Sequence, residues 1–322
     1  MKNGMFTALL AGAMLAATAA SVLAQSFPSK PIRIIVAFTP GGANDVFGRT
    51  IGQKLSERLG QPVIMENKPG ASGNIGAEFV ARSAPDGHTL LAVHNGFPML
   101  PWVSKSLPFD VMKDFAPIGI SVTGSMVVVV ANKLPVKSIN ELIAYARANP
   151  GMLSYATPGI GVPHHMAAEL FMHRTGIKMV QVVYKGSSGM MIDLMSGDVH
   201  VSFTSLSPTV PLIHSGKLRA IAIADRQRLP QFKDLPTVAE SLPGFEVNAW
   251  FGLLAPAGTP DAIINKLSEE QRAIVTLPEV RDRLAGIGYD SNPTSAAEMR
   301  RTMIAEFEQW GEVVKAAGIK PQ

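Results

Sequence analysis

The chain has 322 residues and a formal net charge of +4, with 29 Lys and Arg against 25 Asp and Glu. It contains no cysteine, which excludes disulfides, thiolate metal sites and a lipid-modified cysteine. The mild positive charge comes without basic clusters interleaved with aromatic residues, so no nucleic acid partner is expected. The length suits two domains with adequate cores.

The first 24 residues have the pattern of a secretory leader. Lys2 supplies one positive charge, an acid-free stretch rich in Ala and Leu follows, and small residues precede Gln25. This pattern predicts a signal peptide over residues 1–24, cleaved after Ala24. The alternative is an anchor that stays attached, because the apolar stretch is nearly long enough to span a bilayer. No later run approaches the ~20 apolar residues of a span, so we expect a soluble, exported mature protein.

A strand, a glycine turn and a helix open the mature chain. Residues 32–38 are mostly apolar and predict a buried strand, and residues 45–59 repeat apolar side chains at helical spacing. Gly41 and Gly42 stand between them. Because they have no Cβ, the chain can turn sharply and leave the first N–H groups of the helix free, which suits a carboxylate or phosphate. The alternative is a tight turn that binds nothing.

The remaining chain alternates strand-like and helix-like segments, which favours parallel βαβ units. Sequence signals also mark helix starts at Ser138 with Glu141, at Ser295 with Glu298, and at Thr259 as a cap before Pro260. The expected strands are 63–66, 89–93, 126–131, 153–156, 179–183, 199–203, 218–224 and one beginning at 247. The expected helices are 75–83, 138–149, three beginning near 162, 188 and 207, one from 260, and 295–317 ending at Gly318.

No flexible linker separates the predicted domains. If there are two lobes, the chain must therefore pass between them on ordered strands, and the apolar segments 126–131 and 247–254 are the best candidates. The first lobe would comprise residues 25–123 plus 247–322, and the second residues 124–246. A pair of crossing strands of this kind would form a hinge.

Six segments of the mature chain form a recognisable series. In order, they are PSKPIRIIVAFTPGGAND (28–45), ENKPGASGNIGA (66–77), PDGHTL (85–90), VYKG (183–186), DLPTVAE (234–240) and WFGLLAPAGTP (250–260). Together they resemble one known family, the periplasmic binding receptors of tripartite tricarboxylate transporters, also called Bug proteins. The resemblance implies an α/β, two-lobed Venus-flytrap fold with two α/β domains joined by crossing strands. It also implies a receptor that captures a small organic carboxylate between the lobes and delivers it to membrane transporter subunits.

Four loops at the carboxyl ends of predicted strands should converge on one crevice. They carry backbone N–H groups and hydroxyls suited to a carboxylate, and the resemblance implies that these groups, and not an arginine, hold the ligand. Asn44 or Asp45 is expected to cap the first helix. For each hydroxyl the alternative is a turn or cap that never contacts ligand. The predicted ligand-binding residues are Phe38, Thr39, Gly42, Ala43, Asn44, Asp45, Ser72, Asn95, Thr157, Gly159, Gly161, His165, Thr204 and Ser205.

Some positions depart from the family pattern toward apolar side chains. Phe97, Met99 and Trp102 replace a more polar run after Asn95, and Val162 stands where Ser is common. Thr204-Ser205 likewise replaces a frequent Asp-Asn pair. A less polar pocket suggests a ligand with apolar or aromatic bulk, although ordinary core packing explains the same residues.

An enzyme is the main alternative class. No Gly-x-Ser-x-Gly, Walker or His-Glu-x-x-His motif occurs, so no catalytic residue, cofactor or metal is predicted. The one arrangement that competes is His165, Glu169 and His173, which share a helical face and could ligate a metal in a secreted metal-dependent or hydrolytic enzyme. A solvated helix face is the simpler explanation. We expect a receptor that is a monomer in the periplasm.

Overall fold

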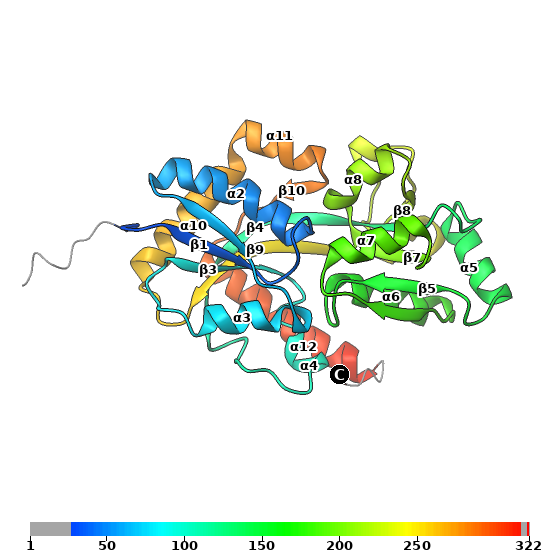
Figure 1. Ribbon diagram of the computed structural model, residues 1–322, viewed down its shortest axis with the longest axis horizontal. Coiled ribbons are helices and arrows are strands. Elements are labelled where there is room, and N and C mark those ends of the chain that lie inside the picture. The colour runs from blue at the N-terminus through cyan, green and yellow to red at the C-terminus, as the bar shows by residue number, and fades with distance from the viewer. Residues whose placement is uncertain (1–26, 317–320, 322) are drawn as a thin grey trace, which may run out of the picture.

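The computed structural model describes residues 27–316 and 321, so the predicted signal peptide and Gly318 lie outside the described residues. The protein has two α/β lobes placed side by side (Figure 1). Each lobe contains a mostly parallel group of strands with helices packed around it. One path of pairing runs through both lobes, and two further strands pair with one of its members off this path. Within residues 27–316, no helix is long and apolar enough to cross a membrane.

The first lobe is built from both ends of the described chain. Strands β1, β2 and β3 are parallel, and β9 pairs antiparallel with β3. Its strands and helices are β1 (Ile32–Val36), α2 (Ala43–Leu59), β2 (Val63–Asn67), η2 (Ala71–Gly73), α3 (Asn74–Ala81), β3 (Thr89–His94), α4 (Leu100–Val103), β9 (Asn248–Pro256), α10 (Asp261–Thr276), α11 (Pro278–Gly286), β10 (Tyr289–Ser291) and α12 (Ala296–Ala316).

The second lobe repeats the same plan with the middle of the chain. Strand β5 is parallel to β6 and β7. Its elements are α5 (Ile139–Ala148), β5 (Ser154–Thr157), α6 (Pro163–Thr175), β6 (Val180–Val183), α7 (Ser187–Ser196), β7 (Val201–Ser205), α8 (Leu206–His214), β8 (Arg219–Ile223), η3 (Pro230–Phe232) and α9 (Val238–Ser241).

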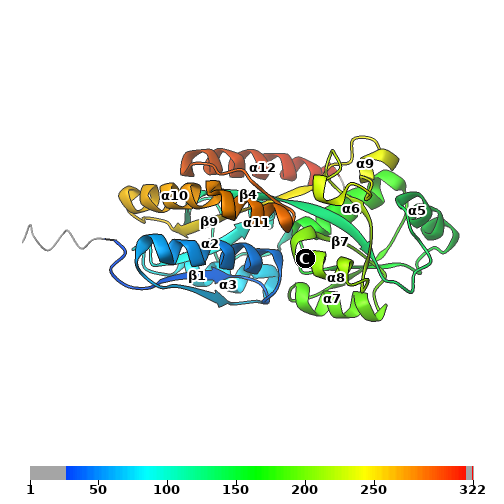
Figure 2. The same ribbon diagram turned by 90° about the horizontal axis from the view of Figure 1, so that it is seen from above.

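Strand β4 (Phe115–Val130) belongs to both lobes and joins them (Figure 2). Its first part pairs antiparallel with β9 and β10, and its second part pairs antiparallel with β7 and β8. The expectation of parallel pairing almost throughout is therefore wrong for the strands that connect the lobes. The chain returns at Val247, whose N–H donates to the Ala224 carbonyl at 2.9 Å.

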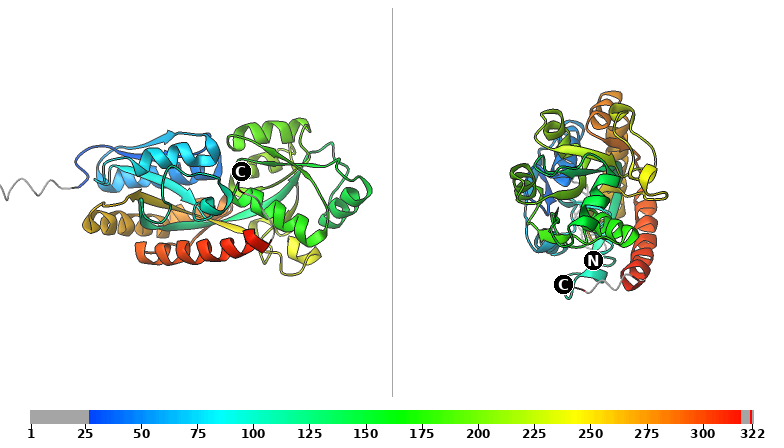
Figure 3. Two further views of the ribbon diagram at one scale, coloured as in Figure 1. Left: turned by 90° about the horizontal axis from the view of Figure 1, so that it is seen from below. Right: turned by 90° about the vertical axis from the view of Figure 1, so that its right-hand side faces the viewer.

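The buried apolar side chains fall into separate clusters on the two sides of this crossing. Two clusters contain residues up to Val122 and from Ala249 onward, and they include Phe47, Phe115 and Phe251. Two others lie between Met126 and Val247. Helix α12 runs along the first lobe, and its last turns reach α6 (Figure 3), where Trp310 and α6 residues line a common groove.

Local signals predicted most helix starts, with three corrections. Both hydrogen bonds of the Ser295–Glu298 capping box form, but Glu141 accepts from Lys137 N and not from Ser138, so only the Ser138 half of that box exists. Thr259 does not cap α10. Its hydroxyl donates to the Pro256 carbonyl at 2.8 Å, and Pro260 is the N-cap residue.

The third correction concerns the glycine turn. Strand β1 ends at Val36, earlier than expected, and α2 begins at Ala43 with Gly42 as its N-cap. Asn44 and Asp45 therefore lie inside the first turn and neither is the cap residue. The left-handed backbone, φ +82°, occurs at Gly41.

Candidate functional site

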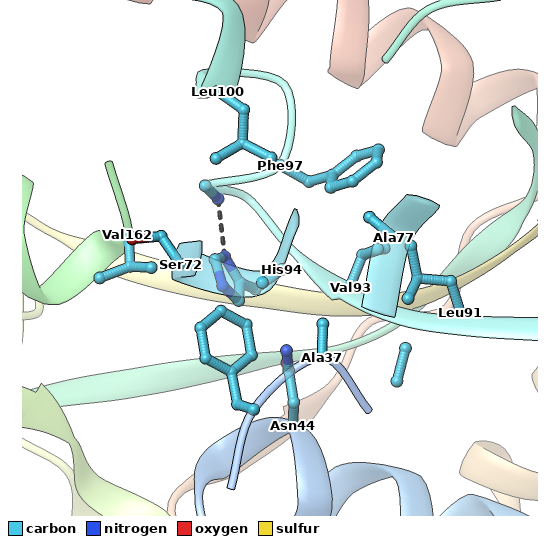
Figure 4. A pocket seen from close by; sticks show the side chains of 14 residues that line it. Ala37, Asn44, Ser72, Ala77, Leu91, Val93, His94, Phe97, Leu100 and Val162 are labelled. Carbon is cyan, nitrogen blue, oxygen red and sulfur yellow. Dashed lines mark hydrogen bonds between the residues drawn. The ribbon is translucent and has the colours of Figure 1, made fainter. Parts of the chain in front are cut away.

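Two adjoining cavities lie where loops of the two lobes meet. Phe38, Asn44, His94 and Val162 line both of them. Figure 4 shows the first cavity with His94 near its centre, Phe97 and Leu100 above it and Asn44 below. The first cavity is further lined by Ala37, Ser72, Gly73, Ala77, Leu91, Ala92, Val93, Gly96, Phe97 and Leu100. The second is further lined by Gly42, Ala43, Pro158, Pro163, His164, Ser187, Ser205, Ala249 and Phe251.

The N-terminus of α2 forms one wall of the second cavity. Gly42, Ala43 and Asn44 line it, and the first turn of a helix has N–H groups without intrahelical acceptors. These groups and the positive end of the helix dipole favour an anion at this position. The Asn44 side chain is 4% exposed, and its Oδ1 has no hydrogen-bond partner in the protein.

Asp45 has a structural role at the same turn. Its carboxylate accepts from Gly41 N at 3.0 Å, from Asn67 Nδ2 at 3.0 Å and from Arg49 Nε at 2.9 Å. Burial opposes ionisation, but these hydrogen bonds outweigh it and lower the pKa of Asp45 below its usual value. Asp45 lines neither cavity and instead fixes the geometry of the glycine turn.

The two arginines near this turn are engaged elsewhere. Arg49 forms an ion pair with Asp45, and Arg33 forms one with Glu66 on the neighbouring strand. Neither lines a cavity, and the lining of both cavities includes no Lys, Arg, Asp or Glu. An anion in these cavities would therefore meet dipoles and neutral donors.

Two histidines that were not predicted as site residues, His94 and His164, lie in the second cavity lining. His94 Nδ1 accepts from Gly96 N at 2.9 Å, the contact drawn as a dashed line in Figure 4. His164 Nε2 accepts from Ser205 N at 3.4 Å. A ring nitrogen that accepts carries no proton, so the proton of His94 is on Nε2 and that of His164 is on Nδ1.

Both imidazoles are neutral near pH 7. Removal from water lowers the pKa of His94 to about 4. The pKa of His164 is lowered to about 3, mainly because the ring is removed from water and in smaller part because His94 lies nearby. The His164 side chain is 8% exposed in all, and its Nδ1 has no partner in the protein. Each ring thus presents one neutral N–H donor.

The loop from Thr157 to His165 is held by its own hydrogen bonds. The Thr157 hydroxyl donates to the Gly159 carbonyl at 2.7 Å, and His165 Nδ1 accepts from Gly161 N at 3.2 Å. Thr157, Gly159, Gly161 and His165 are buried but line neither cavity. The sequence analysis predicted His165 as a ligand-binding residue, but in the structure it is the neighbouring His164 that lines the second cavity.

The two lobes touch beside the cavities. Ile160 N donates to Ser72 Oγ at 3.0 Å, and Ser188 Oγ donates to the Pro40 carbonyl at 2.6 Å. Ser188 also reaches Thr39 Oγ1 at 3.3 Å. Thr39 therefore lies at this contact and not in the lining. The lobes are in a closed arrangement.

The remaining predicted residues lie at the end of β7 and after β3. Ser205 lines the second cavity, is 2% exposed and has an unpartnered Oγ. Thr204 is fully buried beside it, also with an unpartnered hydroxyl, but lines neither cavity. Asn95 donates to the Asn248 carbonyl at 3.1 Å, across to the returning strand. The predicted residues in the lining are Phe38, Gly42, Ala43, Asn44, Ser72 and Ser205.

The structure does not support the alternative of a metal site formed by His165, Glu169 and His173. His165 Nε2 lies 3.7 Å from Glu169 Oε1, and that oxygen accepts from the Tyr155 hydroxyl at 2.7 Å. Among the residues that the structure describes, no three His, Cys, Asp or Glu side chains are grouped so that they could hold a metal ion. Glu169 and His173 line a separate groove with Trp310.

A family model and the sequences of known relatives both assign the chain to one receptor family. Residues 47–319 match the model of the tripartite tricarboxylate transporter family receptor. BugT of Bordetella pertussis is 35% identical over 308 residues, which is 95% of this chain and 94% of that protein.

Solved structures agree with this match. An R. palustris protein solved with adipate has a TM-score of 0.90 and 35% identity, covering 92% of this chain and 100% of that one. The periplasmic binding protein BugD has a TM-score of 0.88 and 32% identity, also covering 92% of this chain and 100% of its own.

Proposed function

The chain belongs to the tripartite tricarboxylate transporter receptor family, as its sequence indicated, and on this premise we propose that it captures a small carboxylate between its lobes for delivery to a membrane transporter. Membership of this family makes the protein a solute-binding receptor. The geometry of the cavities supports a small carboxylate as the solute.

The observation that carries the proposal is a set of buried polar groups without partners around one cavity. His164 Nδ1 and Ser205 Oγ lack a protein partner, both side chains are more than nine-tenths buried, and each can donate to a carboxylate. Asn44 Oδ1 is also buried without a partner, but it is an acceptor and requires a donor from the ligand or from water. An unsatisfied buried polar group costs about 1–3 kcal/mol. A carboxylate between the α2 N-terminus and the His164 N–H would accept hydrogen bonds without needing a cationic side chain.

The direct test is thermal unfolding of the purified mature protein with a library of carboxylates and the matching neutral amides. A bound acid at 100 times its Kd should stabilise the fold by about 2.7 kcal/mol. The amides keep the shape of each acid and remove its charge, so they should give no shift. If no acid raises the unfolding midpoint, or if the amides act equally, the carboxylate proposal fails.

We infer that the lobes divide as residues 25–123 plus 247–322 and residues 124–246. The separate core clusters on either side of Val122 and Val247 support this division. Strand β4 near Met126 and the return at Val247 would then be the hinge, because within residues 27–316 the backbone passes from one lobe to the other at these two segments.

We also propose that the mature receptor begins at Gln25 and acts in the periplasm as a monomer. BugD is a periplasmic binding protein, which supports the compartment, and the leader pattern supports the cleavage site. Mass analysis of a periplasmic extract should find Gln25 at the N-terminus. Recovery of the full-length chain in membranes would contradict this.

We propose further that the protein has no catalytic activity of its own. The lining of the two cavities contains no carboxylate and no arrangement of nucleophile and base. A carboxylate that stabilises the protein should be recovered chemically unchanged after prolonged incubation with it.

A further inference from the structure

The two cavities differ in chemistry beyond the four residues that they share. Gly42, Ala43, His164, Ser187 and Ser205, here called the polar end, supply backbone N–H groups, an imidazole and hydroxyls. On the other side the first cavity extends between apolar side chains. These residues are called the apolar arm: Ala37, Ala77, Leu91, Val93, Phe97 and Leu100.

The apolar arm is backed by a fixed aromatic cluster. Phe97 stacks on Phe109, with ring centroids 6.0 Å apart, and meets Phe115 edge to face at 5.1 Å. Phe97 is 6% exposed and Leu100 is 5% exposed. Packed rings of this kind define a rigid apolar surface that cannot turn polar groups toward a ligand.

The polar side chains that reach the first cavity are Asn44, Ser72 and His94. Asn44 and His94 also line the second cavity, where the polar end lies. The Ser72 hydroxyl already accepts from Ile160 N. The six side chains of the apolar arm therefore offer neither a cation nor a hydrogen-bond donor to a second carboxylate, and a charged group buried without a partner is strongly disfavoured.

We propose that the ligand is a monocarboxylate with an apolar body, an aromatic ring or an alkyl chain, whose carboxylate binds the polar end and whose body fills the apolar arm. This inference rests on the proposed function and narrows it. Val162, which lines both cavities, would contact the ligand where its two parts join.

The test is isothermal calorimetry of the mature protein with benzoate, hexanoate, adipate and malate. Benzoate or hexanoate should bind at least about tenfold more tightly than either diacid, because a second buried carboxylate lacks a partner. Adipate or malate binding as tightly as the monoacids, or more tightly, would overturn the inference and leave the receptor function standing. If none of the four acids binds, the inference is wrong. The thermal unfolding of the protein with the broader carboxylate library then tests the proposed function separately.

A pair of variants locates the apolar contact. Val162→Ser places a favourable N-cap residue at the start of α6 and removes two methyl groups from the junction of the cavities. Affinity for the tighter monoacid should fall roughly tenfold. The matched control, Val183→Ser, changes a side chain that is 46% exposed and lines neither cavity, so affinity should not change. Equal effects of the two variants, with both proteins folded, would contradict the assignment of the arm.

Discussion

A substitution at Gly42 can distinguish anion binding by backbone N–H groups from anion binding by an arginine. Its φ of −79° is accessible to any residue, so a substitution there does not strain the backbone. An added Cβ would lie 3.3 Å from Ser187 Oγ of the other lobe and would project at the cavity wall. The position is therefore a steric probe of the proposed site.

We predict that Gly42→Val abolishes carboxylate binding while the protein still folds, with the free energy of unfolding without ligand lowered by at most about 1 kcal/mol because Val is a poorer N-cap than Gly. The competing account is an arginine clamp. Arg33→Ala serves as the comparison, because Arg33 is paired with Glu66 and its loss should cost at most about 1 kcal/mol of stability and no affinity. Calorimetry on both variants decides. Normal binding by Gly42→Val with loss of binding by Arg33→Ala would show that the backbone account is wrong.

Glu306 gives a prediction about stability and pH. Its Oε1 accepts from Trp250 Nε1 at 2.8 Å, and its Oε2 is buried without a partner. Burial raises the pKa of Glu306 to about 7, against 4.5 ordinarily, although the Trp250 bond lowers it somewhat. The folded state binds the proton more tightly than the unfolded state, so stability from this group falls as pH rises from about 4.5 to 7 and then levels off.

Glu306→Gln keeps an acceptor for Trp250 and removes the charge. We expect the variant to be more stable than the parent at pH 8, on the order of 1–3 kcal/mol, and about equally stable at pH 4.5. Thermal or urea unfolding at the two pH values measures the difference. Glu308→Gln, on an exposed part of the same helix, is the matched control for removing a carboxylate from this helix. Parallel profiles for the two variants would refute the assignment.

At the scale of elements, the contacts between α7 and the glycine turn hold the lobes together. Ser188 on α7 donates to the Pro40 carbonyl and contacts Thr39. A net contribution of about 0.5–1.5 kcal/mol is typical of one such hydrogen bond. Because the bond joins the two lobes, its loss should shift the population toward an open form.

We predict that Ser188→Ala weakens carboxylate binding about three- to tenfold, with faster release. Ser196→Ala is the control on the same helix, because the Ser196 hydroxyl bonds only to Asp193 and Asp198 within its own lobe. Stopped-flow or calorimetric measurements with the tightest acid of the library would compare them. An unchanged affinity in Ser188→Ala would mean that this contact does not contribute to closure.

The elements that short-range signals specify could be predicted, and those that depend on tertiary context could not. The junction of β1 with α2 has a buried apolar run, two glycines and a helical repeat within one stretch. The first half of β4 contains Pro117, Gly119 and Gly124, which normally interrupt a strand. The structure accommodates two of them with irregular pairing to β9, where Gly252 would place a Cβ only 2.4 Å from the Gly119 carbonyl.

The site was only partly predictable for the same reason. Helix α6 is buried around most of its first turns, so its sequence has no clear polar face that would separate His164 from His165. Only His164 reaches the cavity. His94 presents its N–H to the cavity because its other ring nitrogen accepts from Gly96 N. It lines the second cavity together with His164, some 70 residues away in the sequence, and the two come together only in the folded chain.

For the whole molecule, the crossing strands and the closed contacts imply motion between two arrangements. A carboxylate bound at the polar end would touch α2 of one lobe and His164 of the other, so it would stabilise the closed form selectively. A ligand can shift such an equilibrium only by its difference in affinity for the two forms. Without a ligand, the unpartnered groups in the cavity favour an open form in which water reaches them.

We therefore predict that small-angle scattering shows a more extended protein without ligand and a more compact one with a saturating acid. The curve calculated from the closed structure should fit the saturated sample and not the free one. Gly42→Val under the same acid concentration should keep the extended curve, which separates closure from a general effect of the acid. If the radius of gyration of the parent stays constant across a titration that calorimetry shows to be saturating, the two lobes do not close on the ligand.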